Sequence, residues 1–147
     1  MTKNTRLRSV VAVGGKSAPE QGTIISRGVE IEIGTPGRIE DLLEHRLLVL
    51  NQCFFCVLDE SDKMVEMDLE ESVNNIFSNI PESLLKSADE GECREQEVGM
   101  QSGTYFVTNF MMFSATLNAD VKKLAGYLKH NAYVQIGDLG TAKKEIQ

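Results

Sequence analysis

A short apolar run that ends in a cluster of carboxylates constrains the fold of this chain more than any other feature. Residues 54–58 (FFCVL) lead directly into the acidic box DESD, in which Asp59, Glu60 and Asp62 carry the carboxylates. The run has the length and composition of a buried strand. Open α/β sheets bind ligands at the carboxyl ends of their strands. The sequence therefore predicts an α/β fold with an acidic site where this strand ends.

Apolar runs of strand length alternate with stretches of helical periodicity, which is typical of a parallel sheet covered by helices. Thr35 and Pro36 have the residue types of an N-cap and a first helical position, and Asn118 is expected to cap a later helix. The predicted strands are residues 10–13, 29–33, 54–58, 106–113 and 133–136, and the predicted helices are residues 17–26, 37–45, 69–79 and 118–128.

Residues 82–104 interrupt this alternation. They are polar, acidic and nearly free of β-branched or aromatic side chains, so they bury too little apolar surface to offset the entropy of ordering. We expect a mobile acidic insertion here, and a loop this long inside a compact domain indicates a functional role.

The negative charge of the chain is local. The net charge is −7, and residues 59–97 alone carry 13 acidic and 3 basic side chains. The remainder of the chain is therefore slightly basic, and contacts with nucleic-acid phosphates are not excluded there.

Length and composition predict one globular domain or a large piece of one, since 41% of the 147 residues are hydrophobic and 25% are charged. The chain contains no apolar run long enough for a transmembrane helix, and residues 1–6 lack the apolar region of a secretory signal. We expect an intracellular protein.

The three cysteines do not form a disulfide framework, because their number is odd. Cys53 and Cys56 have the C-x-x-C spacing of a metal or redox pair. Side chains three residues apart on a strand point to opposite faces, however. We therefore expect ordinary buried or half-buried thiols.

Two further motifs suggest phosphate contacts. Residues 35–38 (TPGR) open a helix with free backbone N–H groups, a hydroxyl, a glycine and an arginine, which together suit a phosphate; the alternative is a plain helix start. Residues 13–17 (VGGKS) imitate the end of a P-loop, but that pattern requires glycine at position 10, where the chain has Val10. A turn before Pro19 fits this segment better.

The order of these motifs gives the chain a family resemblance. VGG at residues 13–15, TPGR at 35–38, VLDESDKM at 57–64 and FSAT at 113–116 follow one another as in the first RecA-like domain of DEAD-box ATP-dependent RNA helicases. The chain resembles this family from about residue 8 to residue 140. Residues 31–64 and the insertion near residues 82–104 are most similar to the pre-mRNA splicing branch.

The resemblance implies a RecA-like (P-loop NTPase type) three-layer sandwich with a mostly parallel central sheet, of which residues 1–147 form a part that is incomplete at the N-terminus. It implies ATP and Mg²⁺ as cofactors. Asp59 would hold Mg²⁺ through water, and Glu60 would position or activate the attacking water. Asp62 would tie its loop to the hydroxyls of Ser114 and Thr116, which links nucleotide state to RNA strand separation.

The resemblance also implies partners. These are RNA, a second RecA-like domain and spliceosomal proteins, in the nucleus rather than the cytoplasm and without a membrane. Thr35 and Arg38 are the expected direct contacts to the RNA backbone. The full set of expected RNA-binding residues is Gly14, Gly15, Thr35, Pro36, Gly37 and Arg38.

Three departures from the family pattern leave alternatives open. Ser61 replaces the alanine of the family name. Asp68 and Leu69 stand where the family usually has Gly-Phe. Residues 1–147 also contain no P-loop motif. We expect the isolated chain to hydrolyse little ATP and to expose apolar strand residues. One alternative is a non-catalytic, degenerate helicase domain that binds RNA or protein, with the acidic insertion as its docking site. Another is an unrelated α/β phosphate binder.

Overall fold

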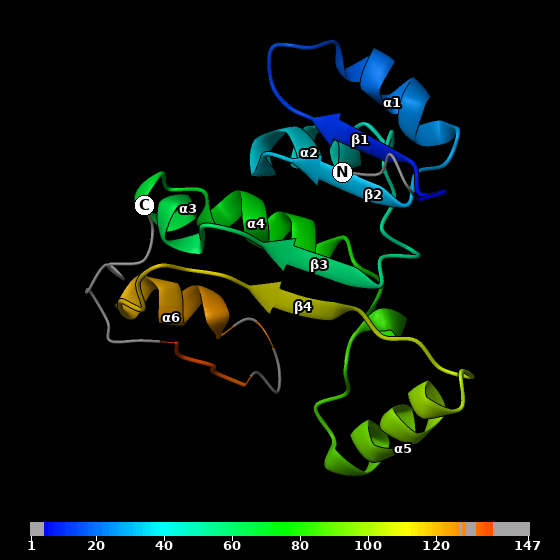
Figure 1. Ribbon diagram of the computed structural model, residues 1–147, viewed down its shortest axis with the longest axis vertical. Helices are drawn as coiled ribbons and strands as arrows, with labels where there is room; N and C mark the ends of the chain where they lie inside the picture. Colours follow the sequence, from blue (N-terminus) through cyan, green and yellow to red (C-terminus); the bar gives the residue numbers. More distant parts are fainter. Residues whose placement is uncertain (1–4, 127, 129–131, 137–147) are drawn as a thin grey trace. The chain divides into compact units, whose positions relative to one another are not determined.

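The chain folds into two compact units in the computed structural model, which describes residues 5–126, 128 and 132–136. Unit 1 comprises residues 1–52 and 71–81, and unit 2 comprises residues 53–70 and 82–147. Each unit contains a two-stranded parallel sheet accompanied by helices (Figure 1). The predicted α/β architecture with parallel strands is confirmed.

The sheet of unit 1 pairs β1 (Ser9–Ala12) with β2 (Ile31–Gly34). Parallel strands need a crossover connection, and α1 (Ala18–Ser26) supplies it. Helix α2 (Pro36–Glu44) follows β2, with Thr35 as N-cap and Pro36 at its first position, as predicted. Strand β2 ends one residue before this N-cap, so the TPGR motif lies at the carboxyl edge of the sheet.

The core of unit 1 lies on one face of this sheet. Ile76 of helix α4 (Glu70–Ser78) packs against this core, and Val73 of the same helix is fully buried. On the opposite face, Val11 and Ile33 remain about half exposed, at 51% and 50%. The buried core residues are Val10, Ala12, Ile25, Leu42, Leu43 and Leu48.

One carboxyl group lies among the apolar residues on the core face of β2. Glu32 pairs in register with the buried Val10, and its Oε1 is buried without a hydrogen-bond partner among the described residues. Burial raises the pKa of Glu32 to about 7, because removing the carboxylate from water disfavours its charged form.

Replacing Glu32 by Gln is expected to stabilise the fold at pH 8 and to change little at pH 5. Between pH 4.5 and 7 the native state retains a proton that the unfolded chain releases, so stability falls as the pH rises through this window. After a discount for partial exposure, we expect a gain of about 1–2 kcal/mol at pH 8. Thermal unfolding at both pH values measures it. Glu44→Gln, at an exposed position, is the matched control, and an equal shift at both pH values contradicts the prediction.

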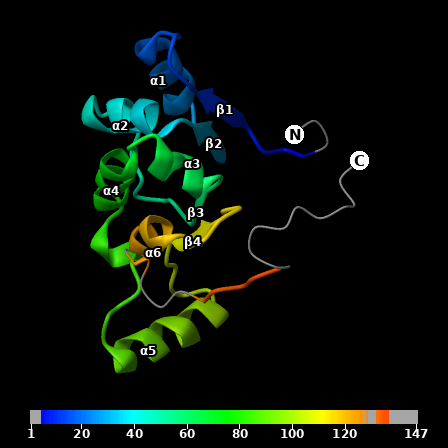
Figure 2. The same ribbon diagram turned by 90° about the vertical axis from the view of Figure 1, so that its left-hand side faces the viewer.

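The sheet of unit 2 pairs β3 (Phe55–Leu58) with β4 (Asn109–Met112), and Leu58 lies opposite Met112. Helices α3 (Ser61–Glu66) and α6 (Ala119–Ala125) follow these strands and contact each other. Both views show the two strands side by side with α6 next to β4 (Figures 1 and 2). The Asn118 side chain caps α6, as predicted, by accepting a hydrogen bond from the Val121 N–H at 2.9 Å.

Unit 2 also leaves apolar strand residues exposed, as expected from the sequence. Phe55, Val57 and Met111 are 65%, 52% and 39% exposed. They alternate with inward residues such as the buried Leu58, because successive strand residues point to opposite faces.

The three cysteines are free thiols. Burial, with a smaller contribution from the neighbouring Cys53, raises the pKa of Cys56 to about 12. Since the thiolate is the reactive and metal-binding form, this shift keeps Cys56 in the less reactive thiol form at neutral pH.

The prediction that residues 82–104 lack regular structure is wrong. They contain the short 3₁₀ helix η1 (Glu82–Leu84) and the helix α5 (Glu90–Gln101). Asp89 caps α5 by accepting hydrogen bonds from the N–H groups of Gly91 and Glu92. Glu, Gln, Arg and Met are good helix formers, so a low apolar content does not prevent a capped helix. Mobility of this segment stays a prediction.

The predicted strand at residues 133–136 is also wrong. These residues have no regular structure, and Val134 and Ile136 are 85% and 82% exposed. Their β-branched character predicts a strand only where a neighbouring strand offers hydrogen bonds. The predicted helix at residues 118–128 ends at Ala125, and residues 137–140 of the predicted resemblance lie outside the described part.

None of the described helices has the length and apolar character needed to cross a membrane.

Candidate functional site

Two carboxylates emerge together at the carboxyl end of β3. Asp59 and Glu60 directly follow the buried Leu58, and both are exposed. Asp59 Oδ1 accepts a hydrogen bond from the Glu60 N–H at 3.0 Å. One oxygen of Asp59 is thereby oriented by the backbone at a ligand-accessible edge of the sheet.

Glu60 has a left-handed backbone conformation, with φ 53° and ψ 48°. This conformation costs a residue with a Cβ atom about 1–2 kcal/mol. The residue is nevertheless held there, because its carbonyl accepts the Lys63 and Met64 N–H groups at the start of α3. Strain of this kind concentrates at functional sites, which supports a role for Glu60 beyond capping.

The FSAT segment lies beside the acidic box, as predicted. The Phe113 N–H donates to the Leu58 carbonyl at 2.8 Å, which continues the β3–β4 pairing to the strand ends. The Thr116 hydroxyl then donates to Oδ2 of the buried Asp62 at 3.4 Å. The two loops are therefore joined through side chains as well as through the sheet.

Ser114 contributes differently from the expectation. Its hydroxyl donates to the Thr116 carbonyl at 2.6 Å rather than to Asp62. This bond stabilises the turn from which Thr116 reaches Asp62. The predicted bridge between the loops is thus made by Thr116, with Ser114 in support.

Ser61, the departure from the family name, is accommodated by the neighbouring loop. Its side chain is fully buried, and its hydroxyl and its backbone N–H both donate to the Phe113 carbonyl at 3.0 Å. A buried hydroxyl costs little when it has a partner. Asp68 stands where the family usually has glycine. Its φ is 55°, a backbone conformation that glycine adopts without strain.

A second group of predicted residues meets at the carboxyl edge of the unit 1 sheet. The Thr35 N–H donates to the Ala12 carbonyl at 3.1 Å, and a Cβ at Gly34 would approach that same carbonyl to 2.6 Å. Glycine at position 34 therefore permits the close approach that brings the TPGR segment next to the VGG segment.

Arg38 holds these two segments together. Its guanidinium donates to the Lys16 carbonyl at 2.8 Å and to Gln21 Oε1 at 3.0 Å, and it pairs with Asp41. Only 14% of the Arg38 side chain is exposed. Arg38 is thus a tether between the two predicted RNA-binding segments, a role that the sequence did not indicate.

Gln21 supports the candidate site through contacts that sequence reasoning missed. It is buried on α1, and its Nε2 donates to the Val13 carbonyl at 3.1 Å while its Oε1 accepts from Arg38. The available signal was a polar residue between Ala18 and Ile25 on the inward face of the predicted helix.

The first turn of α2 leaves donors available. The Thr35 hydroxyl makes no capping hydrogen bond, and a Cβ at Gly37 would meet nothing within 4 Å. Gly14 and Gly15 are likewise open, and Gly15 has φ 77°. Pro36 has no N–H, and the Arg38 and Ile39 N–H groups donate to the Thr35 carbonyl, so the Thr35 hydroxyl and the Gly37 N–H are the donors left at this helix N-terminus. Helix N-termini attract anions, so this edge suits a phosphate.

The VGGKS segment does not form a phosphate cradle. Ser17 caps α1, accepting the Glu20 N–H at 3.4 Å, and Pro19 lies in the first turn of the helix. The Lys16 carbonyl is occupied by Arg38. These contacts support the turn predicted from the sequence over a P-loop.

Mg²⁺ fits the acidic box as a water-mediated ion. In the part of the chain that the structure describes, no three His, Cys, Asp or Glu side chains form a metal-binding group. Mg²⁺ usually keeps several waters and takes one or two carboxylates together with substrate phosphates. The exposed, backbone-oriented Asp59 carboxylate matches that requirement.

Comparisons with known proteins agree with this geometry. The family model described as DEAD/DEAH box helicase matches residues 1–124. The chain is 41% identical over 141 residues to the ATP-dependent RNA helicase ddx23 of Dictyostelium discoideum, covering 95% of the chain and 16% of that protein. It is 41% identical over 139 residues to the pre-mRNA-splicing ATP-dependent RNA helicase PRP28 of Yarrowia lipolytica, covering 93% of the chain and 23% of that protein.

A solved structure extends the agreement to the fold. The crystal structure of the yeast DEAD-box splicing factor Prp28 matches with a TM-score of 0.63 and 29% identity, over 85% of this chain and 24% of that one. The predicted RecA-like fold and the similarity to the splicing branch are confirmed. The chain spans less than a quarter of the length of these relatives. It belongs to the DEAD/DEAH box helicase family.

Proposed function

We propose that this chain supplies the water-activating edge and part of the RNA path of an ATP-dependent RNA helicase that acts in pre-mRNA splicing. The observation that carries the proposal is the pairing of β3 with β4, which brings Asp59, Glu60 and Asp62 to the same sheet edge as Thr116. An acidic turn that only capped a helix would need no second loop beside it.

The two exposed carboxylates have different roles in ATP hydrolysis. Asp59 would hold Mg²⁺ through water, and the ion would supply positive charge to the phosphates of ATP. Glu60 lies one residue further and orients or deprotonates the attacking water. Its left-handed backbone fixes where this carboxylate leaves the strand.

Asp62 and Thr116 form the coupling contact. A buried carboxylate that accepts a hydroxyl from a second loop responds to a shift of either loop. A change at the acidic box on hydrolysis is thereby passed to the segment that follows β4. Ser114 keeps this segment in the geometry that the contact requires.

The RNA backbone binds at the edge of unit 1. The Thr35 hydroxyl and the Gly37 N–H offer donors to a phosphate, and the open surfaces of Gly14, Gly15 and Gly37 let it approach the backbone. Pro36 is buried and sets the start of the helix. Arg38 supplies positive charge and keeps the glycine segment in place.

The partners follow from the names of the relatives. One of them is described as a pre-mRNA-splicing helicase and another as a splicing factor. We propose that the complete protein acts in the nucleus, binds spliceosomal proteins and carries a second RecA-like domain that closes over ATP and RNA.

A chimaera tests the proposal. This chain replaces the aligned segment of the Yarrowia lipolytica PRP28 protein, and ATP hydrolysis is measured with and without single-stranded RNA. We expect RNA-stimulated hydrolysis by the chimaera and negligible hydrolysis by the isolated chain, because the chain itself contains no P-loop.

The control arm is the same host protein with its own segment retained. A folded chimaera that binds RNA but does not hydrolyse ATP would contradict the proposal and support a non-catalytic module. RNA-stimulated turnover by the isolated chain would contradict the second expectation and make Lys16 a phosphate ligand.

A further inference from the structure

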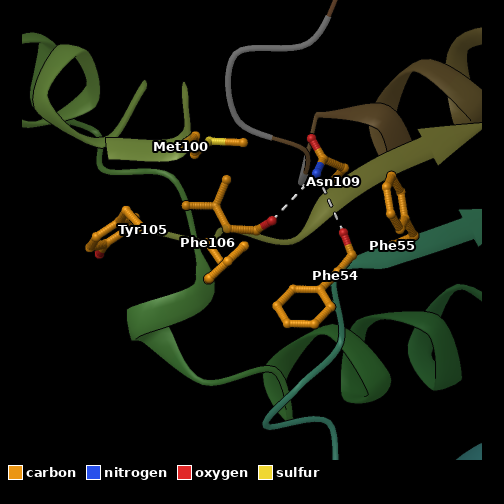
Figure 3. A pocket seen from close by; sticks show the side chains of 7 residues that line it. Phe54, Phe55, Met100, Tyr105, Phe106 and Asn109 are labelled. Carbon is orange, nitrogen blue, oxygen red and sulfur yellow. Dashed lines mark hydrogen bonds between the residues drawn. The ribbon is translucent and has the colours of Figure 1, made fainter. Parts of the chain in front are cut away.

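An apolar pocket of about 310 Å³ opens at the amino ends of β3 and β4 (Figure 3). Its position follows from the parallel pairing, since both strands begin at this edge and end at the edge that carries Asp59. The pocket therefore lies at the opposite edge of the unit 2 sheet from the acidic box. Its main lining residues are Phe54, Phe55, Met100, Tyr105, Phe106 and Val107.

Hydrogen bonds fix the walls of this pocket. The Asn109 N–H donates to the Phe54 carbonyl at 2.8 Å, and the Asn109 side chain donates to the same carbonyl at 3.4 Å. The Tyr105 hydroxyl donates to the Ser83 carbonyl at 3.4 Å and accepts Gln96 Nε2 at 3.3 Å. These hydrogen bonds hold the residues around the open depression in place before a ligand arrives, which reduces the entropic cost of binding.

The aromatic side chains around the cavity are exposed together. Phe54 and Phe106 stack in a tilted pair with ring centroids 5.3 Å apart, yet they are 43% and 55% exposed. Phe55 is 65% exposed. Single exposed apolar residues need no explanation, but a concave cluster of them marks a binding site.

The charge beside the pocket restricts the class of ligand. Helix α5, which contributes Met100, and its cap carry five carboxylates and one cation, Arg94. Glu97 pairs with Lys86 and Glu92 accepts the Ser87 hydroxyl. Glu90 and Glu95 are exposed and have no ion pair in the described ranges. This surface repels nucleic acid and attracts cationic groups.

We propose that the pocket binds a basic peptide segment of a partner protein, with one large apolar side chain in the cavity and flanking Lys or Arg residues against α5. A cavity of this size is at the lower end of the range for ligand pockets and suits one anchoring side chain. The proposal does not depend on the ATP or RNA function, because the acidic box and the TPGR segment take no part in it.

Peptide binding to the full 147-residue chain tests the proposal. The probe is a fluorescein-labelled nine-residue peptide with a central Phe and Lys or Arg at the other positions, measured by fluorescence anisotropy at about 100 mM salt. We expect saturable binding that weakens at least about tenfold when the central Phe is Ala, the loss expected for removing one buried anchor. Flanks of Glu in place of Lys and Arg should abolish it.

Two variants of the chain locate the site. Met100→Gln makes the cavity wall polar without changing its charge and should weaken binding at least about tenfold, with Met100→Ala as a milder change and circular dichroism as the check on folding. Glu90→Lys with Glu95→Lys removes the charge complementarity and should weaken binding about fivefold or more. The matched control, Glu66→Lys with Asp120→Lys, makes the same change in net charge on α3 and α6, which follow the opposite edge of this sheet, and should leave binding unchanged.

Four results would overturn the proposal. The first is that the Phe and Ala peptides bind with equal affinity. The second is that the control pair weakens binding as much as Glu90→Lys with Glu95→Lys does. The third is binding of single-stranded oligouridine that Met100→Gln abolishes, which would make the ligand RNA. The fourth is concentration-dependent self-association lost in the same variant, which would make the occupant a second copy.

Discussion

Replacing Glu60 by Gln in the chimaera is expected to lower RNA-stimulated ATP hydrolysis about 100- to 1,000-fold while ATP and RNA still bind. The substitution keeps the size of the side chain but removes the carboxylate that orients or deprotonates water, and such groups typically contribute 10²–10⁴-fold to rate. The backbone contacts of Glu60 to Lys63 and Met64 do not involve the side chain, so the fold is retained. Single-turnover hydrolysis and nucleotide affinity, measured separately, distinguish a loss of chemistry from a loss of binding.

Glu66→Gln is the matched control for this experiment. Glu66 lies on the same helix, and its exposed carboxylate pairs with Lys63 at 2.7 Å, away from the strand end. Exposed pairs contribute little to stability, so this variant should hydrolyse ATP like the unchanged chimaera. A comparable loss of rate in both variants would mean that Glu60 acts through the stability of α3 and not through water.

Replacing Leu42 by Ala is expected to destabilise unit 1 by about 2–5 kcal/mol, the usual cost of emptying a buried leucine site. Leu42 is fully buried in the last turn of α2 and belongs to the core with Val10 and Ile25. A domain of this size is typically stable by only about 5–15 kcal/mol, so a large part of its stability is lost. The denaturant midpoint and hydrogen exchange of α1 and α2 measure the effect.

Ile24→Ala is the comparison variant for the core. Ile24 lies on α1 but is 47% exposed, so the same kind of truncation should cost less than about 1 kcal/mol. If both variants shift the midpoint equally, Leu42 is not a core residue. Because α2 also presents Thr35, Leu42→Ala should weaken RNA binding in the chimaera even though Leu42 does not reach the surface.

The sequence predicted the parts of the fold that depend on local chemistry. Thr35 with Pro36, and Asn118, are residue types that begin helices, and the structure begins helices at both places. The position of Thr116 beside Asp62 was also predictable, because two parallel strands that end in polar loops bring these loops to one edge.

The errors arise where structure depends on neighbours rather than on composition. The acidic stretch at residues 82–104 lacks apolar side chains, yet Asp89 caps a helix whose own residues favour that conformation. Residues 133–136 have strand composition, but a strand also needs a partner to pair with. Composition indicates what a segment can form, and the contacts decide which form it takes.

The role of Arg38 was only partly predictable for a similar reason. An arginine at a helix start suggests a phosphate ligand, but the sequence does not show that Lys16 and Gln21 lie within its reach. In the folded unit the guanidinium already has these partners. Its expected contribution to RNA binding is therefore both charge and the placement of the glycine segment.

The serine of the acidic box shows why this position tolerates variation. The Phe113 carbonyl that accepts the Ser61 hydroxyl also accepts the Ser61 backbone N–H, so loss of the hydroxyl leaves no buried acceptor without a donor. Exchange between alanine and serine is then nearly neutral, whereas bulkier residues have no room at a site that is fully enclosed. Either small residue can therefore occupy this position without displacing the carboxylates on either side.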